Sequence, residues 1–440
     1  MQGFALGSKI HRVPPKDSDL LDKEAAKQVE HVGAVDILVG IPSFNSARTI
    51  SHVVQAVSAG LMKHFPESRS VIVNSDGGST DGTREVVAST EYTNMERLMV
   101  RHRLHPVHKI ITPYHGIPGK GSAFRTIFKI AQLLGAKACA VVDSDLRSIT
   151  PEWVELLVKP ILNEGYDYTT PLYRRHKYDG TITNSIVYPV TRALYGKRVR
   201  QPIGGDFGFS QALAERYLSK DVWETNVARY GIDIWMTTTA LAEGFKVCQT
   251  YLGAKIHDAK DPGADLAGML MQVVSSVFDL METYYSVWAT VKGSEPVPYF
   301  GFEYSVGLEP IVVNTQRMVD NFRQAVRDLS PIWGDVLEDD TLTSVRDIAG
   351  TDPHRFPDEI WASVVYDFAI AYHRRVMTPD HLLRSLTPLY LGRTAAFVLD
   401  TAEAGSDEVE ERIEALACAY EAGKERFVER WQVNEKGQGR

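Results

Sequence analysis

Short apolar runs alternate with segments of helical periodicity through the first third of the chain. Four runs that favour β-strands stop at polar or glycine-rich turns: residues 35–42, 70–74, 109–112 and 138–142. The segments after the first three runs carry apolar side chains at helical spacing: residues 47–61, 83–89 and 122–134. Such alternation is typical of a parallel, doubly wound sheet with helices on both faces, so we predict an α/β fold.

Two acidic residues, Asp143 and Asp145, directly follow the fourth apolar run. The run would place two carboxylates at the carboxyl end of a buried strand, the edge where open α/β sheets bind ligands. Mg²⁺ and Mn²⁺ take oxygen ligands and are usually held by one or two carboxylates together with substrate phosphates. The pair therefore predicts a divalent metal and a phosphorylated co-substrate, although a polar strand end or a helix cap gives the same short pattern.

Glycine-rich loops after the second and third runs add two candidate sites. Asp76 lies in the loop at residues 75–83, where it would either contact a nucleotide or cap a turn. Gly119 and Lys120 precede the helix expected at residues 122–134, and a helix N-terminus beside a lysine favours a phosphate or a nucleobase edge. The spacing of a Walker A loop is absent, which argues against a kinase or an ATPase.

The second half of the chain is predicted to be mostly helical. Residues 266–288 are largely apolar, but Gln272, Asp279 and Glu282 interrupt them, which indicates a buried or amphipathic helix and no membrane span. A last long helix is expected to begin near Ser406, with an apolar stripe that faces the core or a dimer partner.

Composition is that of an enzyme with a substantial core and no nucleic-acid partner. The chain has 440 residues and a net charge of −8 without a basic block, which argues against nucleic-acid binding. Its three cysteines are far apart in apolar contexts, so we expect buried thiols in a reducing compartment. No apolar signal-peptide core is found in the first 34 residues, and we expect a cytoplasmic protein. We divide the chain into an N-terminal arm at residues 1–34, a catalytic domain at residues 35–262 and a helical region at residues 263–440.

The motifs, taken in order, resemble those of nucleotide-sugar glycosyltransferases with the GT-A fold. The first four lie at residues 41–45, 75–83, 118–121 and 143–145. Four more, at residues 173–175, 201–206 and 231–233 and at His257, are similar to those of the retaining synthases that make glucosyl-3-phosphoglycerate or mannosylglycerate. The resemblance covers about residues 35–261 and implies a Rossmann-like GT-A domain followed by a mostly helical C-terminal region.

This resemblance implies an NDP-sugar donor, either a UDP- or a GDP-hexose, and a Mg²⁺ or Mn²⁺ ion. The implied metal ligands are Asp145 and His257, with Asp143 beside them. Donor-binding residues are expected at the strand ends and in the loops: Pro42, Ser43, Asn45, Asp76, Gly119, Lys120, Asp143 and Ser144. One position departs from the family, because an acid commonly follows the asparagine of the first motif and this chain has Ser46.

Asp206 and Asp233 are the catalytic candidates. In the resembled enzymes their motifs hold donor-sugar hydroxyls and form the floor of the sugar pocket. No residue is identifiable as a covalent nucleophile, so same-face attack through an oxocarbenium-like state is favoured, and double displacement through Asp233 stays open. From the sequence alone, Asp206 could also cap a strand and Asp233 could be the N-cap of the following helix.

The acceptor site is expected around Thr183, which matches a threonine that the related enzymes use for the glycerate carboxylate. The full set of acceptor candidates is Arg174, Gly180, Thr181, Thr183, Gly204 and Gly205. Phosphoglycerate-specific members have an arginine in place of Thr181 and an asparagine in place of Ala259. Both losses favour D-glycerate over 3-phosphoglycerate, since a hydroxyl does not replace a guanidinium at a phosphate, although residues 174–177 could compensate.

We therefore predict a retaining, metal-dependent transferase that moves glucose or mannose from an NDP-sugar to D-glycerate or 3-phosphoglycerate, as in compatible-solute synthesis. A sugar-phosphate nucleotidyltransferase is the alternative, because it shares the nucleotide-binding half and a metal-binding acid. A non-catalytic sugar-nucleotide binder would not need Asp143, Asp145 and His257 together. We expect a homodimer whose partners are small molecules, with no nucleic acid and no membrane span.

Overall fold

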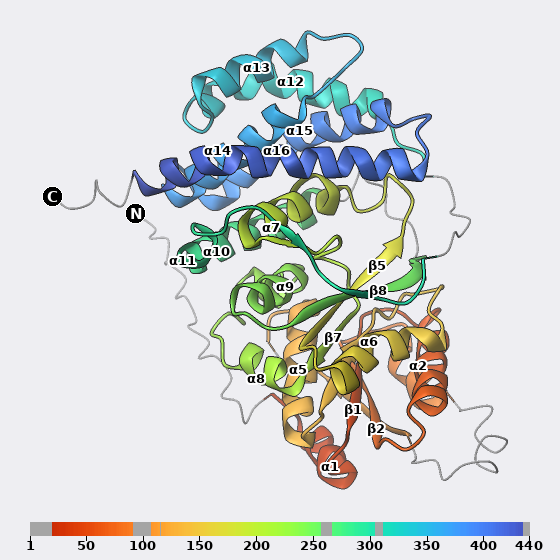
Figure 1. Ribbon diagram of the computed structural model, residues 1–440. Helices are drawn as coiled ribbons and strands as arrows, with labels where there is room; N and C mark the ends of the chain where they lie inside the picture. The colour runs from red at the N-terminus through yellow and green to blue at the C-terminus, as the bar shows by residue number, and fades with distance from the viewer. Residues whose placement is uncertain (1–19, 91–106, 115, 257–265, 304–310, 434–440) are drawn as a thin grey trace, which may run out of the picture.

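The computed structural model describes residues 20–90, 107–114, 116–256, 266–303 and 311–433. In these residues an eight-stranded sheet forms the centre of the molecule (Figure 1). The strand order is β10-β8-β5-β7-β4-β1-β2-β3. The strands are β1 (Ile37–Ser43), β2 (Ser70–Asp76), β3 (Val107–Pro113), β4 (Ala138–Val141), β5 (Tyr168–Arg174), β7 (Phe207–Ser210), β8 (Val247–Ala254) and β10 (Tyr299–Phe300). A separate two-stranded sheet pairs β6 (Lys197–Arg198) with β9 (Glu295–Pro296).

The first four strands are parallel, as the alternation predicts. β1 pairs with β2 and β4, and β2 pairs with β3, all in parallel register. β7 is the exception, because it runs antiparallel to both β4 and β5. The carboxyl ends of β1, β2 and β4 therefore meet at one edge of the sheet, where a ligand site is expected.

Helices cover both faces of this sheet. One face is covered by α2 (Ile50–His64), α3 (Thr83–Ser89) and α6 (Pro151–Glu164). The other is covered by α1 (Lys23–Val32), α5 (Lys120–Leu134) and α8 (Gln211–Leu218). Alternate residues of β1 belong to different cores: Ile37 and Val39 pack with α2 and α6, whereas Leu38 packs with Phe124 and Phe128 of α5. The fully apolar run thus reflects a strand that is buried on both faces.

The N-terminal arm predicted at residues 1–34 contains a helix at residues 23–32. These residues form α1, whose first turn is capped by Asp22, which accepts a hydrogen bond from the backbone of Ala25 at 2.7 Å. Val29 and Val32 are buried in the same core as α5.

The expectation of three buried thiols is wrong for one cysteine. Cys418 is exposed, whereas Cys139 and Cys248 are buried.

The C-terminal helices stack beyond one end of the sheet, at the top of Figure 1. The intermediate layer comprises η2 (Thr183–Val187), α7 (Tyr188–Tyr195), η3 (Asn226–Ala228), α9 (Ile232–Ala242), α10 (Leu266–Thr283) and α11 (Tyr285–Trp288). The outer layer comprises α12 (Thr315–Gly334), α13 (Asp339–Ala349), α14 (Asp358–His373), α15 (Pro379–Asp400) and α16 (Ser406–Gln432). The apolar stripe predicted for the last helix is buried, and Tyr420, Phe427 and Trp431 share one continuous core with α5 and the sheet. The helical layer is therefore packed onto the α/β part, and the division at residues 262 and 263 stays a prediction.

A buried arginine joins α7 to α16. The Arg192 side chain is 3% exposed, and its guanidinium lies 2.6 Å from Glu414 and 3.0 Å from Glu421. Lys177 makes a second joint, because its Nζ donates to the carbonyls of Thr401 at 2.6 Å and Ala402 at 2.8 Å, just after α15. These charged contacts fix α16 and the turn before it against α7 and the loop after β5.

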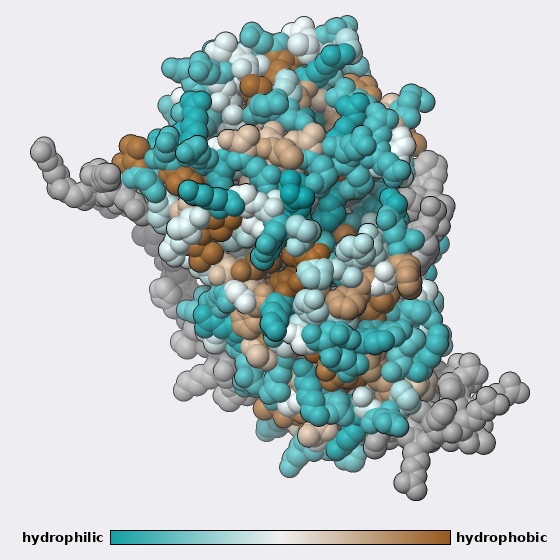
Figure 2. Space-filling view, viewed as in Figure 1, coloured by the Kyte–Doolittle hydropathy of each residue, from teal (hydrophilic) through white to brown (hydrophobic). Residues whose placement is uncertain are grey.

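The surface in Figure 2 is mostly hydrophilic, with hydrophobic residues in small separate groups. Among the described helices, none has the length and hydrophobicity that crossing a membrane requires.

We predict that Arg192→Ala lowers the free energy of unfolding by about 2–3 kcal/mol. The expected loss is smaller than the loss of about 3–5 kcal/mol for breaking a fully buried ion pair, because Glu414 and Glu421 keep some access to water. Urea unfolding measures the change. The control is Arg384→Ala, whose exposed pair with Asp380 should contribute about 0.5 kcal/mol or less. Equal effects in the two variants would contradict a special role of Arg192.

Candidate active site

A cavity of about 940 Å³ opens at the carboxyl ends of β1 and β4, and we call it the first cavity. Predicted site residues that line it are Pro42, Ser43, Asn45, Gly119, Lys120, Asp143, Ser144, Asp145, Gly180, Thr181, Thr183, Gly204, Gly205 and Asp233. Three others do not line it: Asp76, Arg174 and Asp206. His257 lies outside the described residues. The structure thus brings most of the predicted donor and acceptor residues into one space.

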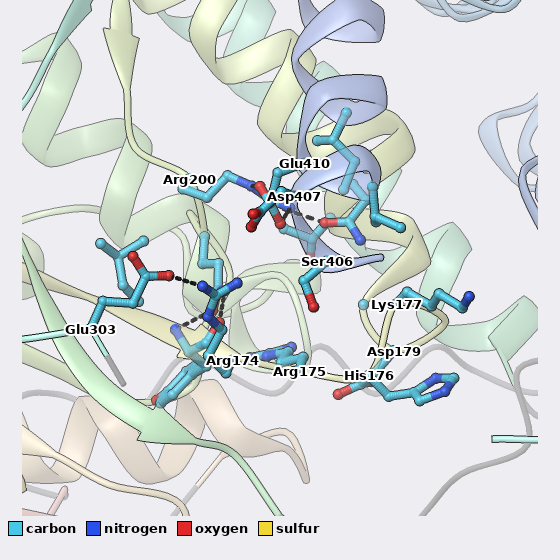
Figure 3. A pocket seen from close by; sticks show the side chains of 18 of the residues that line it. Arg174, Arg175, His176, Lys177, Asp179, Arg200, Glu303, Ser406, Asp407 and Glu410 are labelled. Atoms are coloured by element: carbon cyan, nitrogen blue, oxygen red, sulfur yellow. Dashed lines mark hydrogen bonds and ion pairs between the residues drawn. The ribbon is translucent and has the colours of Figure 1, made fainter. Parts of the chain in front are cut away.

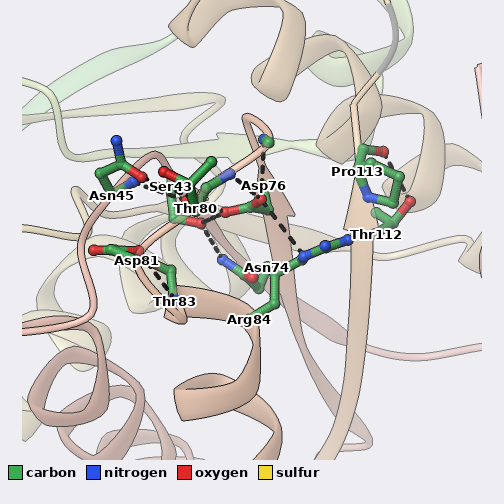
Figure 4. A network of polar contacts seen from close by, with 12 residues as sticks. Ser43, Asn45, Asn74, Asp76, Thr80, Asp81, Thr83, Arg84, Thr112 and Pro113 are labelled. Atoms are coloured by element: carbon green, nitrogen blue, oxygen red, sulfur yellow. Dashed lines mark hydrogen bonds and ion pairs between the residues drawn. The ribbon is translucent and has the colours of Figure 1, made fainter.

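Asp76 is buried beneath the cavity, where it organises the glycine-rich loop (Figure 4). Its Oδ1 accepts hydrogen bonds from the backbone of Gly78 at 3.0 Å and Ser79 at 2.9 Å. Its Oδ2 accepts from the hydroxyls of Ser43 at 3.0 Å and Ser79 at 2.6 Å. Both oxygens are occupied and the side chain is 0% exposed, so the turn-forming alternative holds here and the predicted nucleotide contact of Asp76 is withdrawn.

The first loop is tied to its neighbours by short polar side chains. Asn45 has a positive φ of 50°, and its Oδ1 accepts a hydrogen bond from the backbone of Thr80 at 3.0 Å. Ser46, which replaces the acid common in the family, shares a hydrogen bond with the hydroxyl of Ser144 at 2.8 Å. At this position the chain therefore has a link between two loops where a charged side chain was expected.

Five charged residues form a buried cluster at the floor of the first cavity. Lys120 Nζ lies 2.8 Å from Asp143 Oδ1 and 3.3 Å from Asp233 Oδ1. Lys255 Nζ lies 2.7 Å from Asp143 Oδ2 and 2.9 Å from Asp206 Oδ2. The two lysines, from α5 and the end of β8, therefore bridge three carboxylates that β4, β7 and α9 bring together.

The charges of this cluster stabilise one another. Burial acts to raise the pKa of Asp143, but Lys120 and Lys255 outweigh it and hold that pKa well below its usual range. Burial acts to lower the pKa of both lysines, and the neighbouring carboxylates raise it above the usual value. Burial raises the pKa of Asp206 and Asp233, which the lysines offset only in part. Asp143 is thus the carboxylate that is most firmly kept ionised.

The predicted metal role of Asp143 is not supported, because each of its carboxylate oxygens already has a lysine partner. Asp145 differs: it is exposed at the first cavity and forms no hydrogen bond or ion pair with any described residue. No cluster of three metal-ligating side chains occurs in the part of the chain that the structure describes. A free carboxylate suits a hard divalent cation, so Asp145 fits as one ligand, to be joined by groups outside the described residues or by substrate.

Asp206 is a positioning residue and not a catalytic one in this geometry. It is 0% exposed and accepts hydrogen bonds from the backbone of Asp143 at 2.8 Å and from the Tyr173 hydroxyl. Asp233 does face the first cavity, and its carboxylate lies beside Lys120 Nζ, which is 3.3 Å from Oδ1 and 3.5 Å from Oδ2. The alternative of an N-cap is wrong for Asp233, since Gly231 occupies that position of α9.

Packing, more than anion binding, explains the glycines at the start of α5. A side chain at Gly119 would collide with the backbone of Ala228 and Arg229, and one at Gly121 with the carbonyl of Val227. The backbone N–H of Gly119 already donates to the Tyr114 hydroxyl at 2.9 Å. Lys120 likewise points to carboxylates and holds the cluster, and a phosphate or nucleobase contact of Gly119 and Lys120, which both line the first cavity, stays a prediction.

The acceptor candidates divide between two spaces. Thr183 and Gly180 line the first cavity, whereas Arg174 lines an adjacent cavity and pairs with Glu303. Thr181 is buried, and its hydroxyl shares a hydrogen bond of 2.5 Å with the hydroxyl of Tyr390 from α15. The helical region therefore fills the position where related enzymes place an arginine.

Sequence reasoning missed Lys255 and Tyr390. Lys255 is 5% exposed at the end of β8, and a lone lysine inside the apolar run at residues 251–256 was a usable signal for a buried partner of nearby acids. Tyr390 carried no such signal, because its contact with Thr181 spans more than two hundred residues.

We predict that Lys255→Met lowers the free energy of unfolding by about 3–5 kcal/mol, because Asp143 and Asp206 lose a buried counter-charge. Adding Asp206→Asn should recover part of the loss, since one uncompensated carboxylate is removed. Urea unfolding of both variants measures this. Lys137→Met is the control, since its pair with Asp36 is largely exposed. No recovery in the double variant would contradict the charge coupling.

Comparison with known proteins supports this architecture. Residues 38–223 match the model of glycosyl transferase family 2, and no curated protein sequence matches the chain. One similar solved structure is glucosyl-3-phosphoglycerate synthase from Mycobacterium tuberculosis in complex with Mn²⁺, UDP and glucosyl-3-phosphoglycerate: 22% identity, 62% of this chain, 86% of that chain, TM-score 0.43. A structure of the same synthase with Mg²⁺ and UDP is 21% identical, with 62% of this chain and 85% of that chain covered, and has a TM-score of 0.42.

At this identity and TM-score, the likeness to the synthase carries no conclusion about substrate. The family match runs from β1 to the residues after α8, which includes the parallel strands and the Asp143–Asp145 turn. The GT-A fold with a mostly helical C-terminal region is thereby confirmed. Residues 38–223 therefore match a glycosyl transferase family 2 domain, which identifies this part of the chain as a glycosyltransferase domain.

Proposed function

We propose that this glycosyltransferase moves a hexose from an NDP-sugar, a UDP- or GDP-hexose, to D-glycerate or 3-phosphoglycerate with the help of Mg²⁺ or Mn²⁺. The first cavity supports the proposal most strongly, because it joins the loops after β1 and β4 to Gly180 and Thr183 and contains the free carboxylate of Asp145. Its volume of about 940 Å³ lies within the range of small-molecule sites, roughly 300–1,000 Å³. Donor and acceptor therefore have room side by side.

Asp145 would hold the metal, with His257 as the proposed second protein ligand. A bound divalent ion would neutralise the charge of the departing nucleoside diphosphate. Pro42, Ser43 and Ser144 line the same space from the ends of β1 and β4, where the nucleotide would be positioned. The chain itself thus supplies the shape of the donor site and one open carboxylate.

Retention by same-face attack is the mechanism we propose. Asp233 is the acid that faces the first cavity, but burial raises its pKa and Lys120 lies 3.3 Å from its Oδ1. The ion pair with Lys120 reduces the nucleophilicity of the Asp233 carboxylate, which disfavours a covalent intermediate on this residue. Asp233 and Lys120 would instead shape the sugar pocket and orient hydroxyl groups.

The acceptor proposal rests on Thr183, which lines the first cavity where a small hydroxy acid would meet the donor. The nucleotidyltransferase alternative has no observation in its favour, since the family match is to glycosyltransferases. A homodimer in the cytoplasm stays a prediction, as does a role in making a glycosylglycerate solute.

A matrix of donors against acceptors tests this function. UDP- and GDP-linked glucose and mannose are each incubated with D-glycerate or 3-phosphoglycerate and Mn²⁺, and products are read by mass spectrometry. We expect one hexose added to the acid, together with release of nucleoside diphosphate. Donor consumption without any glycosylated acid would overturn the acceptor assignment.

Asp145→Asn should lower kcat/KM by at least about 100-fold, because weaker metal binding removes several kcal/mol of transition-state stabilisation. Titration calorimetry of Mn²⁺ in the presence of UDP gives a readout that is independent of turnover, and the variant should bind the ion more weakly. Asp380→Asn, on the exposed face of α15, is the matched control. Wild-type Mn²⁺ affinity in Asp145→Asn would refute the metal assignment.

Thr181→Arg should destabilise the protein by about 1–3 kcal/mol, because the guanidinium has to displace the buried Tyr390. Thr181→Val keeps the volume and should lose only about 1 kcal/mol with the hydrogen bond. Thermal unfolding compares the two. A fully stable Thr181→Arg enzyme with a new preference for 3-phosphoglycerate would show that Tyr390 does not restrict this position.

A further inference from the structure

A second cavity, of about 620 Å³, lies between the loop after β5 and the start of α16 (Figure 3). It adjoins the first cavity, because four residues line both spaces: Arg175, Asp179, Gly180 and Thr183. Its volume alone is that of a small-molecule site. A three-carbon acid held at Thr183 would leave this second cavity empty. The acceptor region therefore extends past Thr183 towards the helical layer.

Three of the four arginine and lysine side chains that line the second cavity already have partners. Arg174 pairs with Glu303, and Arg200 donates to both oxygens of Glu410 at 2.8 and 3.0 Å. Lys177 is held by backbone carbonyls after α15. These groups build the wall and leave little net charge to attract an anion.

Arg175 is different, because its guanidinium forms no hydrogen bond or ion pair with any described residue. Its Nε is buried without a partner, and its guanidinium carbon lies 5.0 Å from the ring centre of Tyr173. The ring restricts the guanidinium, and the residue stands where the two cavities meet. A fixed, unpaired guanidinium at such a junction is suited to a planar or tetrahedral oxyanion.

The first turn of α16 faces the same cavity. Gly405 is the N-cap of this 27-residue helix and offers no side-chain cap, and Ser406 and Asp407 line the cavity beside it. Free backbone N–H groups and the positive end of the helix dipole favour an anion here. Asp407 is the one acid of this turn that lines the cavity, and it would weaken anion binding.

We propose that the second cavity binds an oxyanion of the acceptor, a carboxylate or a phosphate, through Arg175, while the reacting hydroxyl group lies in the first cavity. The inference rests on the proposed function and narrows it to acceptors that carry an anionic group beyond Thr183. It also explains how the chain handles such a group although Thr181 is closed off by Tyr390.

Titration calorimetry tests the site with 3-phosphoglycerate, D-glycerate and inorganic phosphate, each added to protein with UDP and Mn²⁺. Arg175→Gln should weaken binding of the preferred anion at least tenfold, and Arg175→Lys less, because the charge remains. Asp407→Asn should tighten it about two- to fivefold. Arg384→Gln, on the exposed face of α15, should match the wild type. Thermal melting shows that each variant is folded.

The three anions distinguish the source of the oxyanion. If only 3-phosphoglycerate and phosphate depend on Arg175, the site takes a phosphate; if glycerate depends on it equally, the site takes a carboxylate. Unchanged affinity for all three anions in Arg175→Gln would overturn the inference, as would a failure of the wild type to bind any of them. Absence of glycosyl transfer to either acid, with Arg175-dependent phosphate binding intact, would instead count against the proposed function alone.

Discussion

The buried pairing of Lys120 and Lys255 with Asp143 is the interaction on which the active site depends. Three strands and two helices deliver charged side chains to one point, and each charge there would be costly if it were left alone. The arrangement also controls backbone geometry. Lys255 donates to the carbonyl of Gly204 at 2.8 Å, and a side chain at Gly205, which has a φ of 88°, would collide with Asp143 and Lys255. The charge cluster therefore also determines the backbone shape of the loop at Gly204 and Gly205.

The helical layer completes the acceptor side of the site. Tyr390 of α15 occupies the position beside Thr181, and the first turn of α16 closes the second cavity. Arg192 and Lys177 hold these helices to α7 and to the loop after β5. Acceptor selection is thus expected to depend on residues far along the chain, whereas the donor side is built from the α/β part.

Periodicity and loop chemistry were enough to predict the parallel strands, the α/β class and the place of Asp143 and Asp145 at one edge, whereas Asp233 was assigned through the family resemblance. Roles within the cluster could not be predicted, because they depend on which carboxylate has a lysine within about 3 Å. Asp76 and Asp206 belong to plausible motifs but are fully buried with their oxygens occupied. The local sequence pattern predicts that a residue lies at a strand end. Whether its side chain faces the cavity or is buried behind the cavity lining depends on tertiary packing.

The charge balance of the first cavity gives a physical reason for a metal. Among described residues its lining carries five acids, Asp81, Asp143, Asp145, Asp179 and Asp233, and five bases, Arg48, Lys120, Arg175, Arg229 and Lys255. A nucleoside diphosphate would therefore enter a nearly neutral space whose lysines are already committed to carboxylates. The two lysines are not free to neutralise its negative charge, because drawing either one away would remove part of the counter-charge that Asp143 has in the cluster. A divalent ion at Asp145 supplies that charge without dismantling the cluster.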